Sequence, residues 1–202
     1  MKLTFAPPND GVAHSYCLYC KQETLQAFEA SGIHQFYCYS CHHTNLRALI
    51  IDPKVVWWTD NSDEYWHEVA GVFAAKPDGT FLFFDRTKYP LGGTIPAGHR
   101  DVGEHGTVTA KRELHEETGI NANVLTPIAT DDVWGDECRR GADVHRWHSF
   151  VTKVPQHTTA DIRDEGVGPL WLTLDQALAC NLTHVTRYVI THHYDEILAA
   201  AR

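Results

Sequence analysis

The chain has 202 residues, more than one small domain and fewer than two average ones, so we expect a core domain with a small appendage. Hydrophobic residues make up 43% of it and charged residues 21%, as in an ordinary globular protein, and no apolar run is long enough to span a membrane. The formal net charge of −9 argues against nucleic acid as a partner, and an anionic nucleotide would need cations, such as a divalent metal, to bind.

The first ten residues, MKLTFAPPND, contain one lysine and no apolar stretch of the kind found in a signal peptide. We therefore expect a cytoplasmic protein. Six cysteines in a reducing compartment argue against a disulfide framework. Two of them, Cys138 and Cys180, stand alone in the sequence and are expected to be ordinary thiols.

The other four cysteines form two CxxC pairs near the N-terminus, separated by 17 residues: Cys17, Cys20, Cys38 and Cys41. Each pair can form a tight knuckle, and four thiolates complete a closed tetrahedral zinc shell. A segment of about 30 residues buries too little apolar surface to fold unaided, so we predict a structural zinc in a zinc-ribbon domain. Two disulfides or redox-active CxxC pairs are the alternatives.

The segment after the cysteines contains the predicted domain boundary. Residues 46–58 hold two short β-type runs broken by Asp52-Pro53, and residues 59–64 are polar and predict a loop. We assign residues 1–58 to the zinc ribbon with its connecting strands, and residues 59–202 to the second domain.

In the second domain, the sequence pattern predicts strands with a few helices between them. This order of elements indicates an α+β fold. The first two strands, 69–76 and 80–86, are joined by a turn at Pro77-Asp78-Gly79. Residues 89–103 predict a loop with a short strand, and residues 107–118 a helix with Thr107 as N-cap and Gly119 as stop. The remaining elements are strands at 123–130, 144–154 and 167–173, a polar loop at 131–143, and helices at 174–180 and 184–201.

Three carboxylates share one face of the helix at 107–118. Glu113, Glu116 and Glu117 are spaced i, i+3 and i+4, whereas Ala110 and Leu114 are expected to face the core. Carboxylates grouped in this way repel one another unless cations bridge them, and their oxygens are the hard ligands that Mg²⁺ and Mn²⁺ prefer. A solvated acidic helix face is the alternative.

The residues around this helix resemble the signature of the Nudix hydrolases. That signature is Gly, five residues, Glu, seven residues, then Arg-Glu-aliphatic-any-Glu-Glu-any-Gly-aliphatic. The matching positions are Gly98, Glu104, Arg112, Glu113, Leu114, Glu116, Glu117, Gly119 and Ile120. The resemblance implies a Nudix-type mixed sheet sandwiched between helices, here preceded by a small zinc-ribbon domain.

The resemblance also implies roles for individual residues. Glu113, Glu116 and Glu117 match the family's ligands for catalytic Mg²⁺ or Mn²⁺, and the backbone carbonyl of Ala97 matches a further metal contact. Glu104 matches a supporting acid, and Arg112 matches the residue that orients the helix carboxylates. Many relatives have glycine where this chain has Ala97.

A general base is expected outside the signature, because the family's bases vary in location. Our candidate is Glu165, which precedes a Gly-rich segment and a strand, and some relatives place an acid about six residues ahead of a similar tryptophan. A surface acid is the alternative for Glu165. The competing acids are Asp131, Asp132, Asp136 and Asp164.

The polar loop at 131–143 supplies candidates for substrate binding. Arg139 and Arg140 are candidates for a clamp on phosphate or ribose, with Trp134 stacking on a base; a solvated loop is the alternative. His145 and His148 lie three apart on a predicted strand, so at most one faces the site, and we expect structural roles for both.

A zinc ribbon ahead of a Nudix domain resembles the NADH pyrophosphatases. Their Ser-Gln-Pro-Trp-like motif is absent here, where the corresponding stretch reads ATDDVWGDECRRG. We expect a metal-dependent hydrolase that cuts the pyrophosphate of a nucleoside diphosphate derivative such as NADH or ADP-ribose, with the small nucleotide as its partner and a homodimer left open. The alternatives are a hydrolase of RNA 5′ caps of the NAD type, and a non-catalytic nucleotide sensor whose ribbon contacts nucleic acid or protein.

Overall fold

The computed structural model of the protein describes residues 1–163 and 165–202. An eight-stranded mixed sheet forms its larger part, with three short strands paired to β7 or β8 and five strands that follow in the order β11-β12-β7-β8-β13. Their bounds are β7 (Tyr65–Ala75), β8 (Phe81–Arg86), β11 (Thr126–Trp134), β12 (Val144–Lys153) and β13 (Gly166–Leu172). β12 runs parallel to β7, and the other neighbours are antiparallel.

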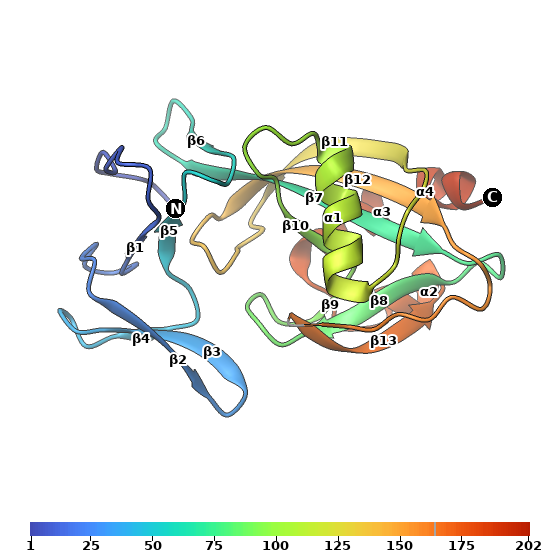
Figure 1. Ribbon diagram of the computed structural model, residues 1–202, viewed down its shortest axis with the longest axis horizontal. Coiled ribbons are helices and arrows are strands. Elements are labelled where there is room, and N and C mark those ends of the chain that lie inside the picture. The colour runs from blue at the N-terminus through green and yellow to red at the C-terminus, as the bar shows by residue number, and fades with distance from the viewer. Residues whose placement is uncertain (164) are drawn as a thin grey trace.

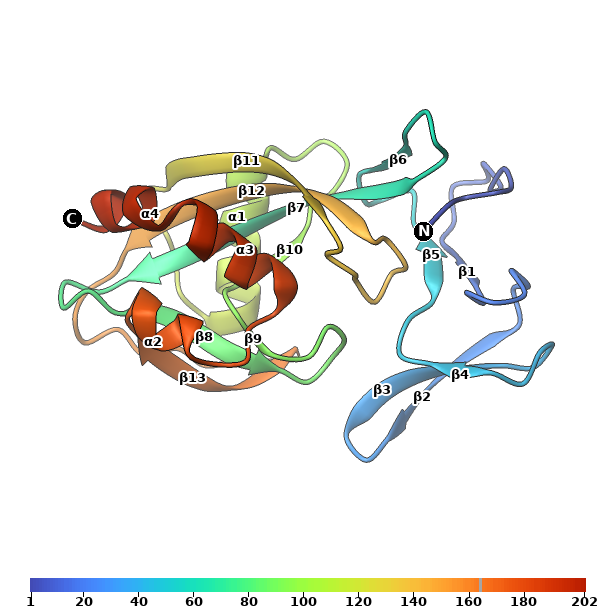
Figure 2. The same ribbon diagram turned by 180° about the vertical axis from the view of Figure 1, so that it is seen from behind.

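Helices cover both faces of this sheet. α1 (Gly106–Thr118) crosses one face, whereas α2 (Leu174–Leu178), α3 (His184–His192) and α4 (Tyr194–Ala201) lie on the other (Figures 1 and 2). The predicted α+β architecture, with a mixed sheet between helices behind a small cysteine-bearing module, is confirmed. Among the described helices, none combines the length and the apolar character that crossing a bilayer requires.

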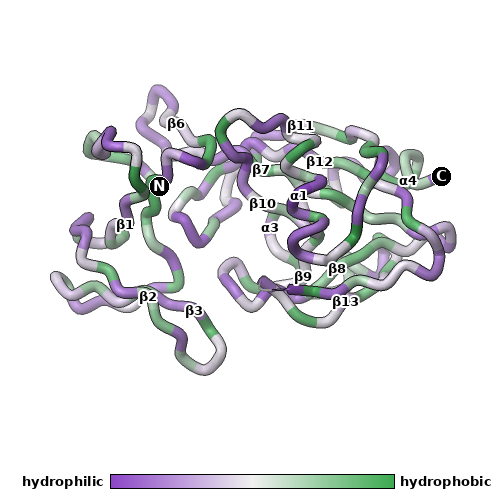
Figure 3. Tube along the Cα trace, viewed as in Figure 1, coloured by the Kyte–Doolittle hydropathy of each residue, from purple (hydrophilic) through white to green (hydrophobic). Residues whose placement is uncertain are grey.

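The alternation of side chains along β7 explains why both faces need a cover. Val69 and Phe73 point into the core beneath α2, α3 and α4, whereas Ala70 and Val72 pack in the core that includes Leu114 of α1. Successive side chains of a strand point to opposite faces, so a strand buried on both sides is apolar at nearly every position. Figure 3 shows hydrophobic residues along the central strands and hydrophilic residues in the outer loops.

Both outer strands of the five-stranded path contain a proline and an irregular register. In β11 the register shifts between Pro127 and Ala129, and in β13 it shifts between Val167 and Leu170, on either side of Pro169. Proline cannot donate a hydrogen bond to a ladder, so it is confined to edge strands and bulges.

The N-terminal module consists of two small sheets. β1 (His14–Tyr16) pairs with β5 (Leu49–Ile51), and β2 (Leu25–Ala30), β3 (Ile33–Cys38) and β4 (Thr44–Asn45) form the other sheet. The turn between β2 and β3 has two central residues, Ser31 and Gly32, with φ of 52° and 74°. Two consecutive positive φ angles give a type I′ turn, whose twist matches that of an antiparallel hairpin.

A loop between β11 and β12, residues 135–143, reaches from the sheet to this module, and we call it the bridging loop (Figure 1). Its Ala142 shares a buried cluster with Tyr16 and Leu49 of the module and Tyr65 of β7. Arg47 donates from Nε to the carbonyl of Cys138 at 2.9 Å and from Nη2 to the carbonyl of Ala142 at 2.9 Å. β6 (Trp57–Thr59), next along the chain, pairs with β7.

Several predicted boundaries differ from the structure, and the first predicted strand begins at Tyr65 rather than at residue 69. The helix begins at Gly106 with His105 as N-cap, and Thr107 lies inside it. β11 continues to Trp134, where a loop is predicted from residue 131, because ladder pairing with β12 and the ion pair between Arg146 and Asp132 support a polar strand. The helix predicted over 184–201 is broken at His193, whose φ of −129° and ψ of 30° are not helical.

Candidate functional site

The carboxylate helix is held against the sheet by its apolar side. Ala110 and Leu114 of α1 are fully buried, as predicted. The glutamates differ in exposure: Glu117 is 5% exposed, whereas the side chain of Glu116 is 57% exposed. Gly119, with φ of 73°, ends the helix as predicted.

A short strand, β10 (Ala97–His99), lies beside α1 and approaches it closely. A Cβ atom on Gly98 would lie 2.1 Å from Cδ of Glu113, so a side chain at this position would displace the Glu113 carboxylate. The backbone N–H of Ala97 donates to Oε2 of Glu117 at 2.8 Å. The Ala97 carbonyl as a metal contact stays a prediction.

Arg112 lies at the centre of the polar contacts of α1. Its Nε and Nη2 donate to the two oxygens of Glu104, both at 3.0 Å, which is a bidentate pair. Its Nη1 donates to Glu113 at 2.6 Å and to Glu116 at 3.2 Å. The hydrogen bonds from Arg112 hold the pKa of Glu104 below its ordinary value. The supporting role of Glu104 and the orienting role of Arg112 stay predictions.

Glu113, which is largely buried, and Glu117, which is almost fully buried, lie near each other. Burial raises the pKa of Glu113 to about 7, with Arg112 opposing the shift. Burial and the charge of Glu113 raise the pKa of Glu117 to about 8. A divalent cation would relieve the repulsion between these carboxylates, so the donor set fits the Mg²⁺ or Mn²⁺ that the signature implies.

A cavity of about 260 Å³ opens beside Glu113, and it brings several predicted residues together. Glu165, which immediately precedes β13, lines this cavity and lies 3.1 Å from Nη2 of Arg86 and 3.5 Å from Nζ of Lys88. Burial alone would raise the pKa of Glu165, but Arg86, Lys88 and Arg139 together hold it below its ordinary value. A carboxylate that stays ionised in the cavity has the form that a general base requires.

The acids that compete with Glu165 have other partners or positions. Asp131 contacts Nε2 of His193 at 2.8 Å, and Asp132 pairs with Arg146 on the surface. Asp136 lines the cavity but is 5% exposed and lies 3.0 Å from Nδ1 of His145. Asp164 lies outside the described residues.

The three predicted substrate residues separate in the structure. Arg139 and Arg140 line the cavity, and Arg140 also donates to Asp52 at 2.9 Å. Trp134 is 57% exposed and packs edge-on against Trp66 with ring centroids 5.1 Å apart. Trp134 is therefore not among the described residues that line the cavity, because β11 extends to it and turns it outward.

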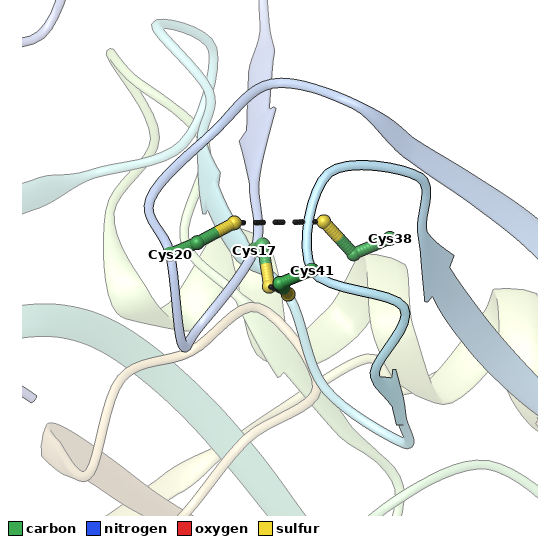
Figure 4. A group of neighbouring side chains, drawn as sticks. All are labelled: Cys17, Cys20, Cys38 and Cys41. Carbon is green, nitrogen blue, oxygen red and sulfur yellow. Dashed lines mark hydrogen bonds between the residues drawn. The ribbon is translucent and has the colours of Figure 1, made fainter.

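The four N-terminal cysteines converge, as Figure 4 shows. Their sulfur atoms lie within 4.8 Å of one another, with 3.5 Å between Cys17 and Cys41 and 3.6 Å between Cys20 and Cys38. These separations are near the roughly 3.8 Å expected between thiolates that share a tetrahedral zinc. No disulfide joins these free thiols.

The two knuckles have the same backbone geometry. The residue after each CxxC pair is left-handed, with φ of 58° at Lys21 and 60° at His42. Each donates its N–H to the carbonyl of the first cysteine of its pair, Lys21 to Cys17 at 3.0 Å and His42 to Cys38 at 2.9 Å. The repeated turn points two thiols from each knuckle at one place, a geometry compatible with the predicted zinc ribbon.

Another group of metal-ligating side chains was not predicted. His67, His99, Cys138 and His145 place their donor atoms within 4.8 Å of one another. Burial alone would raise the pKa of the Cys138 thiol, but His145, His67 and His99 hold it well below its ordinary value. Cys138 is thus not in the environment of an ordinary thiol. His148, three residues from His145, instead contacts Glu68 at 2.6 Å.

The spacing of these four residues explains why the sequence does not reveal them. Three strands and the bridging loop supply one residue each, so no pair has the spacing of a local metal motif. The alternation of His145 and His148 along one strand is the only local signal, and it shows that one of them faces inward.

Comparisons with known proteins agree with the signature helix and the sheet. The model of the NUDIX domain family matches residues 66–193. An ADP-ribose pyrophosphatase of Bacillus subtilis (strain 168) is 34% identical over 113 residues, which are 53% of this chain and 58% of that protein. The chain therefore spans less than two thirds of the length of this curated relative.

Solved structures share the fold at low sequence identity. A Nudix hydrolase from M. smegmatis, RenU, superimposes with a TM-score of 0.55 at 20% identity, covering 73% of this chain and 96% of that chain. The NUDIX domain of Shewanella oneidensis NrtR, complexed with ADP ribose, gives 0.56 at 14% identity, covering 69% of this chain and 93% of that chain. With the family match over residues 66–193, these findings show that the chain belongs to the NUDIX domain family, as its signature predicts.

Proposed function

We propose that the protein hydrolyses the pyrophosphate bond of a nucleoside diphosphate linked to another moiety, with Mg²⁺ or Mn²⁺ as the catalytic cation. One observation carries this proposal: Glu113 lines a cavity that also presents Arg86 and Arg139, and the buried Glu117 lies close enough for the charges of Glu113 and Arg86 to shift its pKa. Anionic ligands for a cation and cationic ligands for a phosphate therefore lie at one place, which suits an anionic substrate that binds with metal.

The chain's own residues provide most of the proposed machinery. Arg139 and Arg86 would bind diphosphate oxygens, and Arg112 keeps Glu104 and Glu113 in place by donating to both. A bound divalent cation would neutralise charge on the diphosphate and on the departing phosphate.

Glu165 is proposed as the general base. It would take a proton from a water molecule as that water attacks one phosphorus atom, and the bridging P–O bond would break to give two phosphomonoesters. Arg86 and Lys88 hold the carboxylate at the wall of the cavity and keep it ionised. Asp136 is the less suitable acid, since it is nearly inaccessible and already faces His145.

ADP-ribose is the first substrate to test. It is the substrate in the name of the B. subtilis relative, and ADP ribose is the ligand of the NrtR domain. The cavity of about 260 Å³ is smaller than the roughly 300–1,000 Å³ of a typical ligand pocket, so part of a dinucleotide such as NADH would project from it. For the ribbon we propose one structural zinc, bound by the four cysteines of the two knuckles.

The test is turnover by the full chain in Mg²⁺ or Mn²⁺, with ADP-ribose, NADH and a 5′-NAD-capped RNA as substrates. We expect AMP and ribose 5-phosphate from ADP-ribose, identified by chromatography, and no products when the cations are chelated. Cleavage of the capped RNA in strong preference to both free nucleotides would support the cap hydrolase instead. Tight binding of a nucleotide with no turnover in either metal would contradict the proposal and indicate a sensor.

A further inference from the structure

A second group of metal ligands lies at the wall of the cavity, outside the signature helix, and three of its members, His99, Cys138 and His145, line the cavity. His67 comes from β7, His99 from β10, Cys138 from the bridging loop and His145 from β12. His67 and His145 are 1% exposed and Cys138 is 9% exposed. Four separate segments thus bring side chains with transition-metal donor atoms together at a largely buried site.

The hydrogen bonds around His67 leave a lone pair facing the group. The hydroxyl of Tyr65 donates its single proton to the carbonyl of Ile50 at 2.9 Å, so it can only accept from Nε2 of His67, 2.7 Å away. The ring proton of His67 therefore sits on Nε2. Its Nδ1, without a proton, lies 3.7 Å from Sγ of Cys138.

His145 is oriented in the same sense by a carboxylate. Its Nδ1 lies 3.0 Å from Oδ2 of Asp136, which is itself 5% exposed. The contact is an ion-pair distance rather than a formed hydrogen bond, and a carboxylate beside one ring nitrogen, with the other nitrogen left for a metal, is the arrangement found behind many metal-bound histidines. Asp136 thus fits a supporting position behind His145.

His99 completes the set. Its Nε2 is sealed from solvent and has no hydrogen-bond partner among the residues the structure describes. Its ring packs edge-on against His67 at 4.7 Å between centroids and lies 5.9 Å from the ring of His145. A buried nitrogen without a partner is costly, and a metal ion would satisfy it.

A hydrogen-bonded cysteine without metal explains these contacts less well. Without metal, a Cys138 thiolate can accept a hydrogen bond from a protonated imidazole, but it has no proton to give to the lone pair of another ring. A nucleophilic cysteine needs one base, not three surrounding histidines. One cation with four ligands satisfies every donor atom at once.

We infer that His67, His99, Cys138 and His145 bind a zinc ion, at a site separate from the four-cysteine ribbon. Three imidazoles and one thiolate suit zinc, and four protein ligands leave no open position, so this zinc is structural. Tetrahedral zinc sets its ligand atoms roughly 3.3–3.8 Å apart, which the 3.7 Å contact between His67 and Cys138 matches.

The proposed zinc would fasten the bridging loop to the sheet. Cys138 is the ligand from this loop, and the next two residues, Arg139 and Arg140, line the cavity. His99 also accepts a hydrogen bond at its carbonyl from Nη2 of Arg112, 3.1 Å away. The ion would therefore position cationic residues at the cavity, and its closed shell of four protein ligands would leave no coordination place for a substrate atom.

Zinc content tests this inference without any substrate, so the result does not depend on the proposed hydrolysis. The full chain is purified under reducing conditions, loaded with zinc in excess Mg²⁺ to keep zinc off the glutamates, and dialysed. We expect about two zinc ions per chain in the wild type, one in Cys138→Ser, and one in Cys17→Ser/Cys20→Ser. Cys180→Ser, a matched control at an exposed cysteine, should retain two. A wild type with one zinc, all of it lost in Cys17→Ser/Cys20→Ser, would overturn the inference.

Two further measurements cover the case in which Cys138→Ser does not fold. Asp136→Asn keeps all four ligands but removes the supporting carboxylate, and it should weaken one of the two zinc sites by roughly 10–100-fold in competition with a chelator. In the zinc-loaded wild type, Cys138 should resist alkylation while Cys180 reacts. Unchanged zinc affinity in Asp136→Asn together with rapid alkylation of Cys138 would also overturn the inference.

Discussion

The burial of Glu117 makes it the sharpest single test of the proposed cation site. Replacing Glu117 with Gln should lower turnover by at least about 10²–10³-fold, because the amide is a poor ligand for a hard cation. The fold should persist, since the amide oxygen can still accept the N–H of Ala97 that now donates to Oε2 at 2.8 Å. Steady-state kinetics and thermal unfolding measure the two effects.

A control variant distinguishes an effect at the cation site from the general effect of removing one negative charge. Glu196 of α4 is exposed, so Glu196→Gln removes the same charge away from the cavity. This control should keep wild-type turnover, and Glu116→Gln should lose activity as Glu117→Gln does. Near-normal activity in both variants of α1 would exclude a catalytic role for these glutamates.

Glu165 allows a prediction about pH. Its pKa lies below the ordinary 4.5, so the base is ionised above that lowered pKa and is lost only as pH falls through it. Glu165→Gln should lower kcat by roughly 10²–10⁴-fold, leave KM similar and remove this acidic limb from the pH profile. A variant with wild-type kcat and an unchanged acidic limb would assign the base elsewhere, and Asp164 would be tested next.

At the scale of single residues, local motifs were predictable and assembled sites were not. The signature fixes the positions of Glu113 and Glu117 because both lie on one helix, whose geometry follows from spacing alone. Whether His67, His99 and His145 come together depends on how three strands pair. The spacing of residues along the sequence does not reveal that pairing. Trp134 was misplaced for a related reason: ladder pairing with β12 decides where β11 ends.

The N-terminus of α1 lacks a side-chain cap. His105 occupies the N-cap position with extended backbone, φ of −94° and ψ of 152°, and makes no capping hydrogen bond. His105→Ser would supply an oxygen acceptor for a free N–H of the first turn and should stabilise the protein by about 1 kcal/mol. Urea denaturation would show this as a higher midpoint, with kcat unchanged.

The matched control for this helix cap is His105→Ala, which removes the ring without adding an acceptor. It should not raise the midpoint, because alanine is a poor N-cap. Equal midpoints for the serine and alanine variants would mean that water already satisfies the first turn of α1.

Most elements follow from local patterns, with their ends set by tertiary contacts. Gly119 ends α1 as predicted, because a left-handed residue there costs glycine little. The last helix is divided at His193, whose ring nitrogen contacts Asp131 of β11 at 2.8 Å. A contact with a distant strand cannot be read from helical periodicity, so the sequence predicts one helix where there are two.

The attachment of the N-terminal module depends on Arg47, whose side chain is 11% exposed. It donates to two carbonyls of the bridging loop and pairs with Glu137 at 2.9 Å and with Asp143. Arg47→Met should destabilise the protein by about 2–3 kcal/mol, because the loop carbonyls lose their charged donor. Chemical denaturation measures the loss, and limited proteolysis should show earlier cleavage near the bridging loop.

A surface ion pair provides the comparison for Arg47. Arg146 pairs with Asp132 at 2.8 Å, with both side chains more than 40% exposed. Arg146→Met should cost less than about 1 kcal/mol, since solvent screens exposed pairs. If the two variants were equally stable, the contacts of Arg47 would not hold the module in place.

The prolines and register shifts of β11 and β13 affect how copies of the molecule can meet. An unprotected outer strand offers a row of free N–H and C=O groups, on which a strand of another molecule can add. Here Pro127 and Pro169 each remove a donor, and the adjacent bulges bend the strands away from a straight template. The addition of a strand from another molecule is therefore disfavoured at both outer strands of the sheet, β11 and β13. This protects the protein against fibrillar aggregation while it is concentrated or partly unfolded.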